Sequence, residues 1–429
     1  MIKMFWNLKE VQEQEEDMQT QKKQIALIGA GKLGKGYLAD LFGRAGYELI
    51  FMARNPAQVA QMRAQGYYTV VLEHEDGSGM ELYRMEGFQI WCTEGPERED
   101  CLRILSEVPI ASIQVYDNGF AAVGKLLGEA IARRAEAGAP PLDILLVVNY
   151  PSSDKIFADL IEAELHTETQ RRYFHEQVGL VKTLAFRGGY AAPEEVLRQD
   201  PQAIGATDYP DLPVDGEAFR GEFPKVEGLI PLDNMDARLK AKLWTGNMRG
   251  GMLGAFAGRK GYTLCEQARV DPEIQAFCDL GYDEAVDGVL RYFHMIYEDF
   301  QKGERKKFPL VEGAKAKTTD TIARQMFGLR RKLGREERLV GPAMACVETG
   351  RLPYFLAAAI AMAFDYVNPE DPDSLEVSAF LREHGIREAV QEYCGLHIAD
   401  DKENLLIQLI CGHYAALHLP KVMQENAEA

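Results

Sequence analysis

A glycine-rich turn near the N-terminus is the first feature of this sequence that could do chemistry. Residues 29–36 read Gly-Ala-Gly-Lys-Leu-Gly-Lys-Gly and directly follow an apolar run at residues 24–28. In such a turn the first glycine permits a tight bend, the second lets a pyrophosphate approach the backbone, and the third lets helix and strand pack closely. The helix that follows offers free N–H groups to phosphate oxygens. The pattern predicts a dinucleotide site, in preference to a glycine-rich turn without a ligand, at Gly29, Gly31, Lys32, Leu33 and Gly34.

A guanidinium group, and no carboxylate, follows the second predicted strand of this unit. That strand covers residues 48–52 and continues as Ala53-Arg54-Asn55. NAD-specific sites usually place Asp or Glu here to hold the ribose hydroxyls, whereas an arginine can bind a 2′-phosphate through paired hydrogen bonds. Arg54 therefore predicts a preference for NADP(H) over NAD(H). The alternative is that Arg54 is a solvated loop residue.

Three more stretches follow the glycine turn along the chain. They read PLDILLVVN at residues 141–149, KLWTGN at 242–247 after Asp233-Asn234, and LRRKL at 329–333 with ETG at 348–350. With the glycine turn they resemble the polyol-specific long-chain dehydrogenases, a mannitol dehydrogenase-like family, in the family's order and at nearly its spacing. The resemblance spans roughly residues 24–365 and implies a Rossmann-type domain followed by a mainly helical one.

The family pattern K-x4-N-x2-H indicates which residues would do the chemistry. Lys242 and Asn247 match its first two positions, and Gly250 stands where the family has histidine. Asn149 matches a second family asparagine, although Val148 precedes it where the family often has Glu. The resemblance implies that Lys242 is the general acid/base and that Asn149 and Asn247 hydrogen-bond the reacting oxygen.

This chemistry requires no metal. Oxidation of an alcohol needs a base for the hydroxyl proton, and a lysine can serve if burial or a neighbouring cation such as Arg249 lowers its pKa. Carboxamide N–H donors would stabilise the developing alkoxide. On an ideal α-helix Lys242 and Asn247 lie about 140° apart around the axis, so we expect them to border one pocket without stacking. Arg249 and Arg330 are candidate partners for an anionic substrate group, with a solvated charged helix face as the alternative for residues 330–332.

The elements that must position these residues form an α/β pattern followed by helices. Prolines between residues 190 and 232 predict loops and short strands, and helix-forming residues dominate from 233 onward. We therefore expect an N-terminal extension at 1–23, a Rossmann-type domain at 24–232 and a helical substrate domain at 233–429, with the substrate in the cleft between the domains. Further expected elements are a helix at 37–45, strands at 68–72, 88–92, 112–116 and 144–148, a hairpin turn at 76–79 and a helix at 121–137.

Composition excludes several other classes of protein. The 48 basic and 66 acidic residues give a net charge of −18, which argues against a nucleic-acid or anionic membrane surface. The longest apolar run, residues 352–364, falls short of the about 20 residues of a membrane span and predicts a buried helix. Seven scattered cysteines without a C-x-x-C pair predict reduced thiols in a cytoplasm, with no metal site. Monomer and homodimer stay open.

The sequence thus predicts a metal-independent, NAD(P)-dependent oxidoreductase that interconverts the hydroxyl of a polyol, sugar phosphate or sugar acid and the corresponding ketone. One alternative is a Rossmann-plus-helical dehydrogenase of a keto acid. Another is a nicotinamide-binding sensor or scaffold with impaired catalysis, because Gly250 replaces the family histidine.

Overall fold

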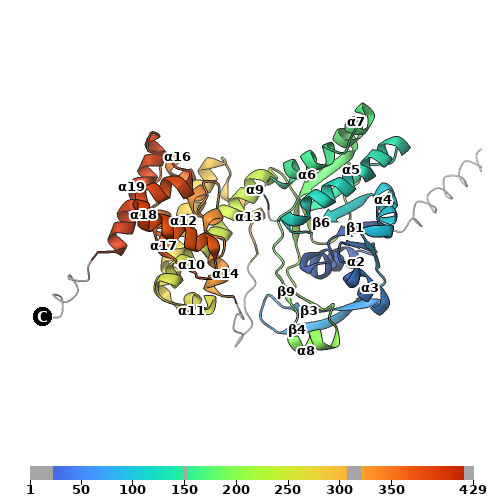
Figure 1. The fold of residues 1–429 in the computed structure, drawn as a ribbon, viewed down its shortest axis with the longest axis horizontal. Helices are drawn as coiled ribbons and strands as arrows, with labels where there is room; N and C mark the ends of the chain where they lie inside the picture. Colours follow the sequence, from blue (N-terminus) through green and yellow to red (C-terminus); the bar gives the residue numbers. More distant parts are fainter. Residues whose placement is uncertain (1–22, 149, 151, 307–319, 420–429) are drawn as a thin grey trace, which may run out of the picture. The chain divides into compact units, whose positions relative to one another are not determined.

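The computed structural model describes residues 23–148, 150, 152–306 and 320–419, which form two compact units (Figure 1). The first unit contains residues 23–235 with Arg305 and Lys306, and the second contains residues 236–304 and 320–419. Of the predicted N-terminal extension at 1–23, only Lys23 is among the described residues.

A six-stranded parallel sheet forms the centre of the first unit. Its strand order is β5-β2-β1-β6-β7-β8, so the chain builds one half outward from β1 and then crosses to β6. This reversal is the topological switch point at which doubly wound sheets bind ligands, and it confirms the Rossmann-type prediction. The strands are β1 (Gln24–Ile28), β2 (Glu48–Ala53), β5 (Gln89–Cys92), β6 (Ile110–Ile113), β7 (Leu142–Leu146) and β8 (Val178–Lys182).

Helices cover both faces of this sheet because its strands are apolar on both sides. In β1, Ile25 and Leu27 belong to one hydrophobic cluster, while Ala26 and Ile28 belong to another on the opposite face. The first cluster includes η1 (Gly34–Leu38), α2 (Ala39–Arg44) and α3 (Pro56–Gln65). The second includes α4 (Arg98–Glu107), α5 (Phe120–Ala137), α6 (Ser153–Glu162) and α7 (Glu168–Gln177).

The predicted helix at 37–45 begins earlier than expected. The chain is helical from Lys32, and η1 is a π-helical turn in which the Ala39 N–H bonds to the Gly34 carbonyl. The predicted strands 112–116 and 144–148 end early, at Ile113 and Leu146. Of the residues beyond these ends, Gln114, Val115 and Tyr116 line a cavity at the carboxyl edge of the sheet, whereas Val147 is buried.

A smaller layer packs against the α2 side of the first unit. Its four-stranded sheet has the order β4-β3-β10-β9, and a hairpin turn with positive φ at Gly77 and Gly79 joins β3 and β4, as predicted. Arg187 forms a buried ion pair with Asp40 of α2 at 2.7 Å and also donates to the Gly36 carbonyl. The layer contains β3 (Tyr67–Glu73), β4 (Met80–Glu86), β9 (Gly189–Ala191), α8 (Glu194–Gln199) and β10 (Ile204–Thr207), with the pair β11 (Leu212–Asp215) and β12 (Leu229–Leu232) nearby.

The described part of the second unit is helical. Its core includes the predicted buried helix, because Leu356–Phe364 of α17 are all buried. The helices are α9 (Met235–Lys242, which begins at the unit boundary), η4 (Leu243–Asn247), α10 (Met248–Arg259), α11 (Cys265–Val270), α12 (Pro272–Tyr292), α13 (Tyr297–Lys302), α14 (Ile322–Met326), α15 (Leu329–Lys332), α16 (Val340–Glu348), α17 (Tyr354–Asp365), α18 (Pro372–Cys394) and α19 (Asp401–Leu417).

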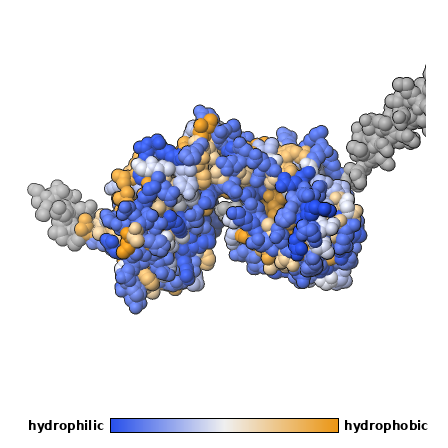
Figure 2. Space-filling view, turned by 90° about the horizontal axis from the view of Figure 1, so that it is seen from above, coloured by the Kyte–Doolittle hydropathy of each residue, from blue (hydrophilic) through white to orange (hydrophobic). Residues whose placement is uncertain are grey.

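The surface is mostly hydrophilic on the face shown in Figure 2, where hydrophobic residues form small scattered patches. Among the residues that the structure describes, no helix combines the length and the apolar character needed to cross a membrane.

Candidate functional site

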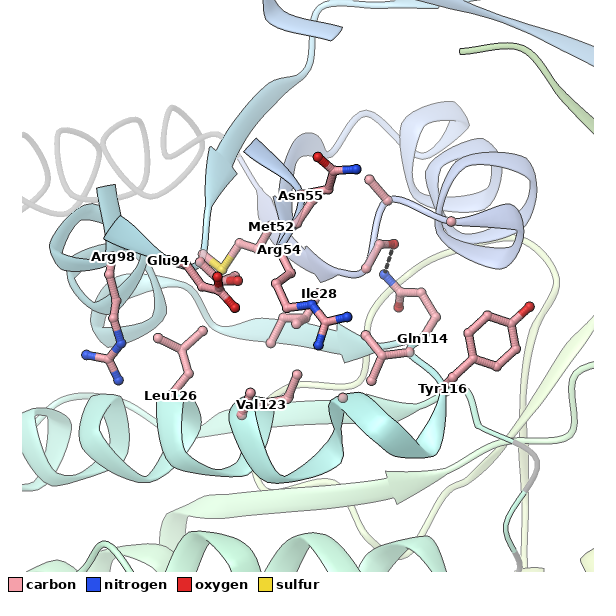
Figure 3. A pocket seen from close by; sticks show the side chains of 18 of the residues that line it. Ile28, Met52, Arg54, Asn55, Glu94, Arg98, Gln114, Tyr116, Val123 and Leu126 are labelled. Carbon is pink, nitrogen blue, oxygen red and sulfur yellow. Dashed lines mark hydrogen bonds between the residues drawn. The ribbon is translucent and has the colours of Figure 1, made fainter. Parts of the chain in front are cut away.

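A cavity of about 680 Å³ opens beside the glycine turn at the carboxyl edge of the parallel sheet. The ends of β1, β2, β5 and β6 form its floor, and the α5 side chains Val123 and Leu126 form an apolar wall (Figure 3). Since β1 and β6 flank the switch point, the cavity lies where a Rossmann-type sheet binds its dinucleotide.

The three glycines of the turn meet different surroundings. Gly29 has φ +116°, and a Cβ atom there would lie 2.7 Å from the backbone oxygen of Gln114. A Cβ atom on Gly34 would lie 2.2 Å from the Gly29 carbonyl oxygen. Apart from its own neighbours in the chain, no described residue has an atom within 4 Å of the Cβ position at Gly31, which faces the cavity. Gly29 and Gly34 therefore hold the turn together, and Gly31 leaves its open side accessible to a diphosphate.

Two glutamines that the sequence analysis did not single out orient the carbonyls of this turn. Gln114, just after β6, donates from Nε2 to the Gly29 oxygen at 3.0 Å, and Ser112 holds its Oε1 at 2.9 Å (Figure 3). Gln58 of α3 donates to the Ala30 oxygen at 2.9 Å. Both carbonyl oxygens are therefore already bonded to glutamine side chains. The sequence signal that could have identified these two glutamines was their position, Gln114 at the end of a predicted strand and Gln58 on the first turn of a helix.

Arg54 lies at the end of β2 and points into the cavity (Figure 3). Its side chain is exposed, and its guanidinium forms no ion pair within the described residues. The next residue, Asn55, caps α3 by accepting the Ala57 N–H at 3.0 Å. The Asn55 cap thus fixes the backbone next to Arg54, while the guanidinium of Arg54 stays available to a ligand.

Charged residues also line the outer end of the cavity. Arg98 of α4 bonds to Glu129 of α5 at 2.7 Å and links the two helices there, and Glu94 lies between Arg98 and Arg54 in Figure 3. Arg63 bonds to Glu97 at 2.8 Å, which holds the turn after β5 in place. That guanidinium, together with the Cys92 N–H, lowers the pKa of Glu97 to about 2.

The other predicted dinucleotide residues do not line the cavity directly. Lys32 is exposed and Leu33 is half-buried on the first turn of the helix, and Gly34 is buried beneath the turn. Lys35 follows them but points into the smaller layer, where its ammonium donates to the Gln202 carbonyl at 2.7 Å. Burial lowers the pKa of Lys35 to about 8, although Asp200 acts in the opposite direction.

Lys242 and Asn247 lie in the second unit, at the two ends of a π-helical turn. Lys242 is the last residue of α9, η4 spans Leu243–Asn247, and the Met248 N–H bonds to the Leu243 carbonyl. The predicted separation of about 140° assumed α-helical geometry and is wrong, because five residues complete about one turn of a π-helix. Both residues are half-buried. The turn therefore brings the two side chains toward the same face.

Trp244 lies within this π-helical turn and packs closely against the neighbouring helix. Its indole N–H donates to the Glu336 carbonyl at 3.0 Å, and a Cβ atom on Gly341 would lie 2.3 Å from that nitrogen. Thr245 is fully buried and donates to the Ala241 carbonyl at 2.7 Å. Such a back-bond from a threonine bends helices, and π-helical turns occur often at functional sites.

The remaining predicted site residues have varied surroundings. A Cβ atom on Gly250 would lie 3.2 Å from Oε1 of Gln325, so the side chain of Gln325 occupies the space beside this position. Arg249 pairs with Asp279 at 2.6 Å, and Arg330 is exposed and pairs with Glu376 at 3.2 Å. Asn149 lies outside the described residues. Among the residues that are described, no three His, Cys, Asp or Glu side chains come together as metal ligands would.

The fold and the cavity define a Rossmann-type dinucleotide-binding protein, and comparison with known proteins identifies its family. Residues 23–228 match the family model described as the mannitol dehydrogenase Rossmann domain. Mannitol-1-phosphate 5-dehydrogenase of Bacillus licheniformis is 26% identical over 408 residues, which cover 91% of this chain and 100% of that protein. The enzyme of the same name from Bacillus subtilis (strain 168) is 26% identical over 87% of this chain and 95% of its own. These similarities confirm the predicted resemblance to a mannitol dehydrogenase-like family, and the predicted enzyme class, an alcohol dehydrogenase, is confirmed.

Solved structures share the fold at low sequence identity. D-sorbitol dehydrogenase in substrate-free form has a TM-score of 0.72 at 13% identity and covers 93% of both chains. The ternary complex of Pseudomonas fluorescens mannitol 2-dehydrogenase with NAD and D-mannitol has a TM-score of 0.65 at 13% identity, covering 95% of this chain and 94% of its own. These similarities confirm the predicted Rossmann-plus-helical architecture.

Proposed function

We propose that this protein catalyses the NAD(P)-dependent interconversion of a polyol, sugar phosphate or sugar acid with the corresponding ketone, with Lys242 as the general acid/base and no metal. One observation carries the proposal: the glycine turn lines a cavity of about 680 Å³, with open space at the Cβ position of Gly31, in a chain similar to the mannitol dehydrogenase family. The relatives with curated names act on mannitol 1-phosphate by name, and this supports the substrate class.

The residues of the cavity suit a nicotinamide dinucleotide. The space at Gly31 and the backbone N–H groups that follow it accept a diphosphate, and Val123 and Leu126 offer an apolar surface to a planar base. When bound, the dinucleotide supplies or accepts the hydride. The chain's own residues hold and orient it, and Gln58 and Gln114 keep carbonyl oxygens turned away from the phosphates.

In the proposed mechanism the proton is handled by side chains of the second unit. Lys242 takes the hydroxyl proton during oxidation and returns it to the oxygen during reduction. Asn247, on the same π-helical turn, donates an amide N–H to that oxygen and stabilises its developing negative charge. Asn149 stays a predicted second donor.

We further propose that NADP(H) is preferred over NAD(H). The supporting observation is Arg54, whose guanidinium points into the cavity from the strand end where NAD-specific sites carry a carboxylate (Figure 3). The seven free cysteines, six of them buried, support the proposed location in a reducing cytoplasm.

The test is reduction of a panel of ketoses, ketose phosphates and keto-sugar acids by the full chain with NADPH and with NADH. We expect turnover with at least one class, faster with NADPH and unchanged after treatment with a metal chelator. Turnover of branched keto acids alone would replace the polyol substrate by a keto acid. Inhibition by the chelator that added metal reverses would contradict the metal-free mechanism.

A second candidate function is a nicotinamide-binding sensor or scaffold with impaired turnover. Gly250 favours it, because this position has no side chain and Gln325 lies beside it. Tight NADPH binding with no turnover of any panel member would favour this candidate over the enzyme.

A further inference from the structure

A second cavity lies in the first unit, between α2 and the smaller layer, and its volume is about 630 Å³. Its lining comes from α2, the end of β3, the start of β4, the loop around Arg187, the segment after β10 and the loop before β12. Sites for small molecules usually measure about 300–1,000 Å³. This cavity shares no lining residue with the dinucleotide cavity, so it is a separate candidate site.

One wall of this cavity carries more cationic than anionic groups. Asp40 of α2 accepts from Nη1 of Arg187 at 2.7 Å and from Nε of Arg44 at 2.7 Å. Burial acts to raise the pKa of Asp40, but the hydrogen bonds and charges of Arg187 and Arg44 outweigh it and lower that pKa. Asp40 therefore stays ionised. One carboxylate faces two guanidinium groups, which leaves one positive charge in excess at this wall.

The guanidinium of Arg187 keeps an unused donor at this wall. Its Nε donates to the Tyr209 carbonyl at 2.9 Å, and its Nη1 donates to the Gly36 carbonyl at 3.1 Å as well as to Asp40. Nη2 donates to no described residue, although the side chain is only 4% exposed. Among the described residues, the one fully buried side-chain atom without a partner is Oδ1 of Asp154. Nη2 of Arg187 therefore keeps accessible surface, on a side chain that lines the cavity.

The facing wall, at the start of β4, carries an unpaired carboxylate. Glu81 is exposed, lines the cavity and has no hydrogen bond or ion pair within the described residues. Beside it, Nδ1 of His74 lies 2.9 Å from Oδ2 of Asp208. That hydrogen bond raises the pKa of His74, and the charge of Glu81 acts in the same direction. Glu81 shares its face of β4 with Tyr83, about 7 Å along the strand, and the Tyr83 hydroxyl bonds to the carboxylate of the cationic wall at 3.0 Å.

The remaining charged residues of the lining balance one another. Lys225 and Glu227 are both exposed and opposite in sign. Asp211 forms an ion pair with Lys306. The cavity as a whole thus offers a cationic wall on one side and a carboxylate on the other, a short distance apart.

We propose that this cavity binds a small zwitterion, a molecule with a carboxylate and an ammonium group such as a free amino acid. Arg187 and Arg44 bind the carboxylate, because guanidinium N–H groups form charge-assisted hydrogen bonds with such an anion. Glu81 binds the ammonium group. A ligand with one of the two charges uses only one wall. The inference goes beyond the proposed function, because neither a nicotinamide dinucleotide nor a polyol carries an ammonium group.

The test is isothermal titration calorimetry of the full chain with the common free amino acids as probes. Each amino acid that binds is compared with the hydroxy acid of the same skeleton, which lacks the ammonium group, and with the amine, which lacks the carboxylate. We expect at least one amino acid to bind. The matching hydroxy acid and amine should bind about tenfold or more weakly, because each lacks one set of charge-assisted hydrogen bonds.

Two variants assign the charges to their walls. Glu81→Gln should weaken the amino acid about tenfold and change the affinity for the hydroxy acid about twofold or less. Arg187→Lys keeps a charge opposite Asp40 but loses Nη2, so it should weaken both ligands. If Arg187→Lys does not fold, Arg44→Gln tests the same wall with the same expected loss, since the Arg44 side chain is 65% exposed. Glu86→Gln, an exposed glutamate of β4 outside the lining, is the matched control and should change neither affinity.

Three results would overturn this site. They are no binding of any common amino acid, equal binding of an amino acid and its hydroxy acid or amine, and equal affinities of Glu81→Gln and Glu86→Gln for the amino acid. The titration needs no turnover, so its result does not depend on whether the proposed dehydrogenase activity is correct.

Discussion

The dinucleotide cavity of the first unit is shaped by the backbone, whereas the proposed role of the Lys242 region in the second unit depends on side chains. The cavity is shaped by backbone: Gly29 and Gly34 have no space for a Cβ atom, and Gln58 and Gln114 orient main-chain carbonyls. In the second unit, Lys242 precedes one irregular turn, and its proposed role depends on its charge. From this difference we expect a single added methyl group to damage the first region, and the loss of a single charge to damage the proposed chemistry of the second.

The largest expected effect concerns the charge of the second region. Lys242→Ala should lower turnover by about 10³-fold, the size of a general acid/base contribution, while NADPH affinity stays within about twofold because the cavity is built by other residues. Steady-state kinetics and fluorescence titration of NADPH measure the two quantities. Lys240→Ala removes a lysine two residues away that pairs with Glu336 at 2.8 Å, and it serves as control. Equal turnover of Lys242→Ala and the control would remove Lys242 from the mechanism.

The backbone of the first region is tested by adding carbon atoms at two of its glycines. Gly34→Ala should lower the free energy of unfolding by about 3 kcal/mol, because its methyl group meets the Gly29 carbonyl. Gly31→Val should leave that free energy nearly unchanged and weaken the binding of NADPH about tenfold or more, which corresponds to a loss of about 1.4 kcal/mol or more of binding free energy. Urea unfolding and NADPH titration separate the two. A stable Gly34→Ala protein, or a Gly31→Val protein with normal affinity, would contradict the distinction between them.

Within the dinucleotide cavity, Arg54 is a charged side chain that we expect to contact the cofactor directly. Arg54→Ala should weaken NADPH about tenfold to 100-fold, as for the loss of bonds to a phosphate, and should weaken NADH about twofold or less. Arg103→Ala, which removes an exposed arginine of α4, should change neither affinity. Titration of both cofactors makes the comparison, and equal losses for NADPH and NADH would reject the contact with a 2′-phosphate.

The last expected effect is a pH dependence of stability that arises beneath the glycine turn. The pKa of Lys35 is about 8 in the folded protein and about 10.5 when exposed, so between these values the unfolded chain binds more protons. The free energy of unfolding of the wild type should therefore rise with pH from about 8 to 10.5, relative to Lys35→Met, by at most about 3 kcal/mol. Urea unfolding at stepped pH checks the sign. A difference that falls over this range would show that Lys35 is charged in the fold.

Much of the first unit could be predicted from local sequence. The apolar runs of β1 and β2 and the glycine turn carry their signals within a few residues, because a buried parallel strand must be apolar on both faces. The start of the following helix could not be predicted this way. Gly34 and Gly36 look like loop residues, yet they are helical, and Gly29 and Ala206 pack where their side chains would otherwise lie.

The second unit was harder to predict beyond its helical character. The pattern of Lys242 and Asn247 was visible in the sequence, but their angular relation depends on a π-helical turn that accompanies the packing of Trp244 against Gly341. Arg330, which the sequence offered as an anion partner or as part of a solvated helix face, is exposed and pairs with Glu376 at 3.2 Å.

The sequence by itself determined the order of the strands along the chain, the glycine turn and the residue types available for chemistry, since each of these depends on neighbours within a few positions. Tertiary structure alone decided which glycine stays open, which carbonyls are turned away, and which cations lack a counter-ion. Those properties depend on atoms brought close by packing, from residues far apart in the chain.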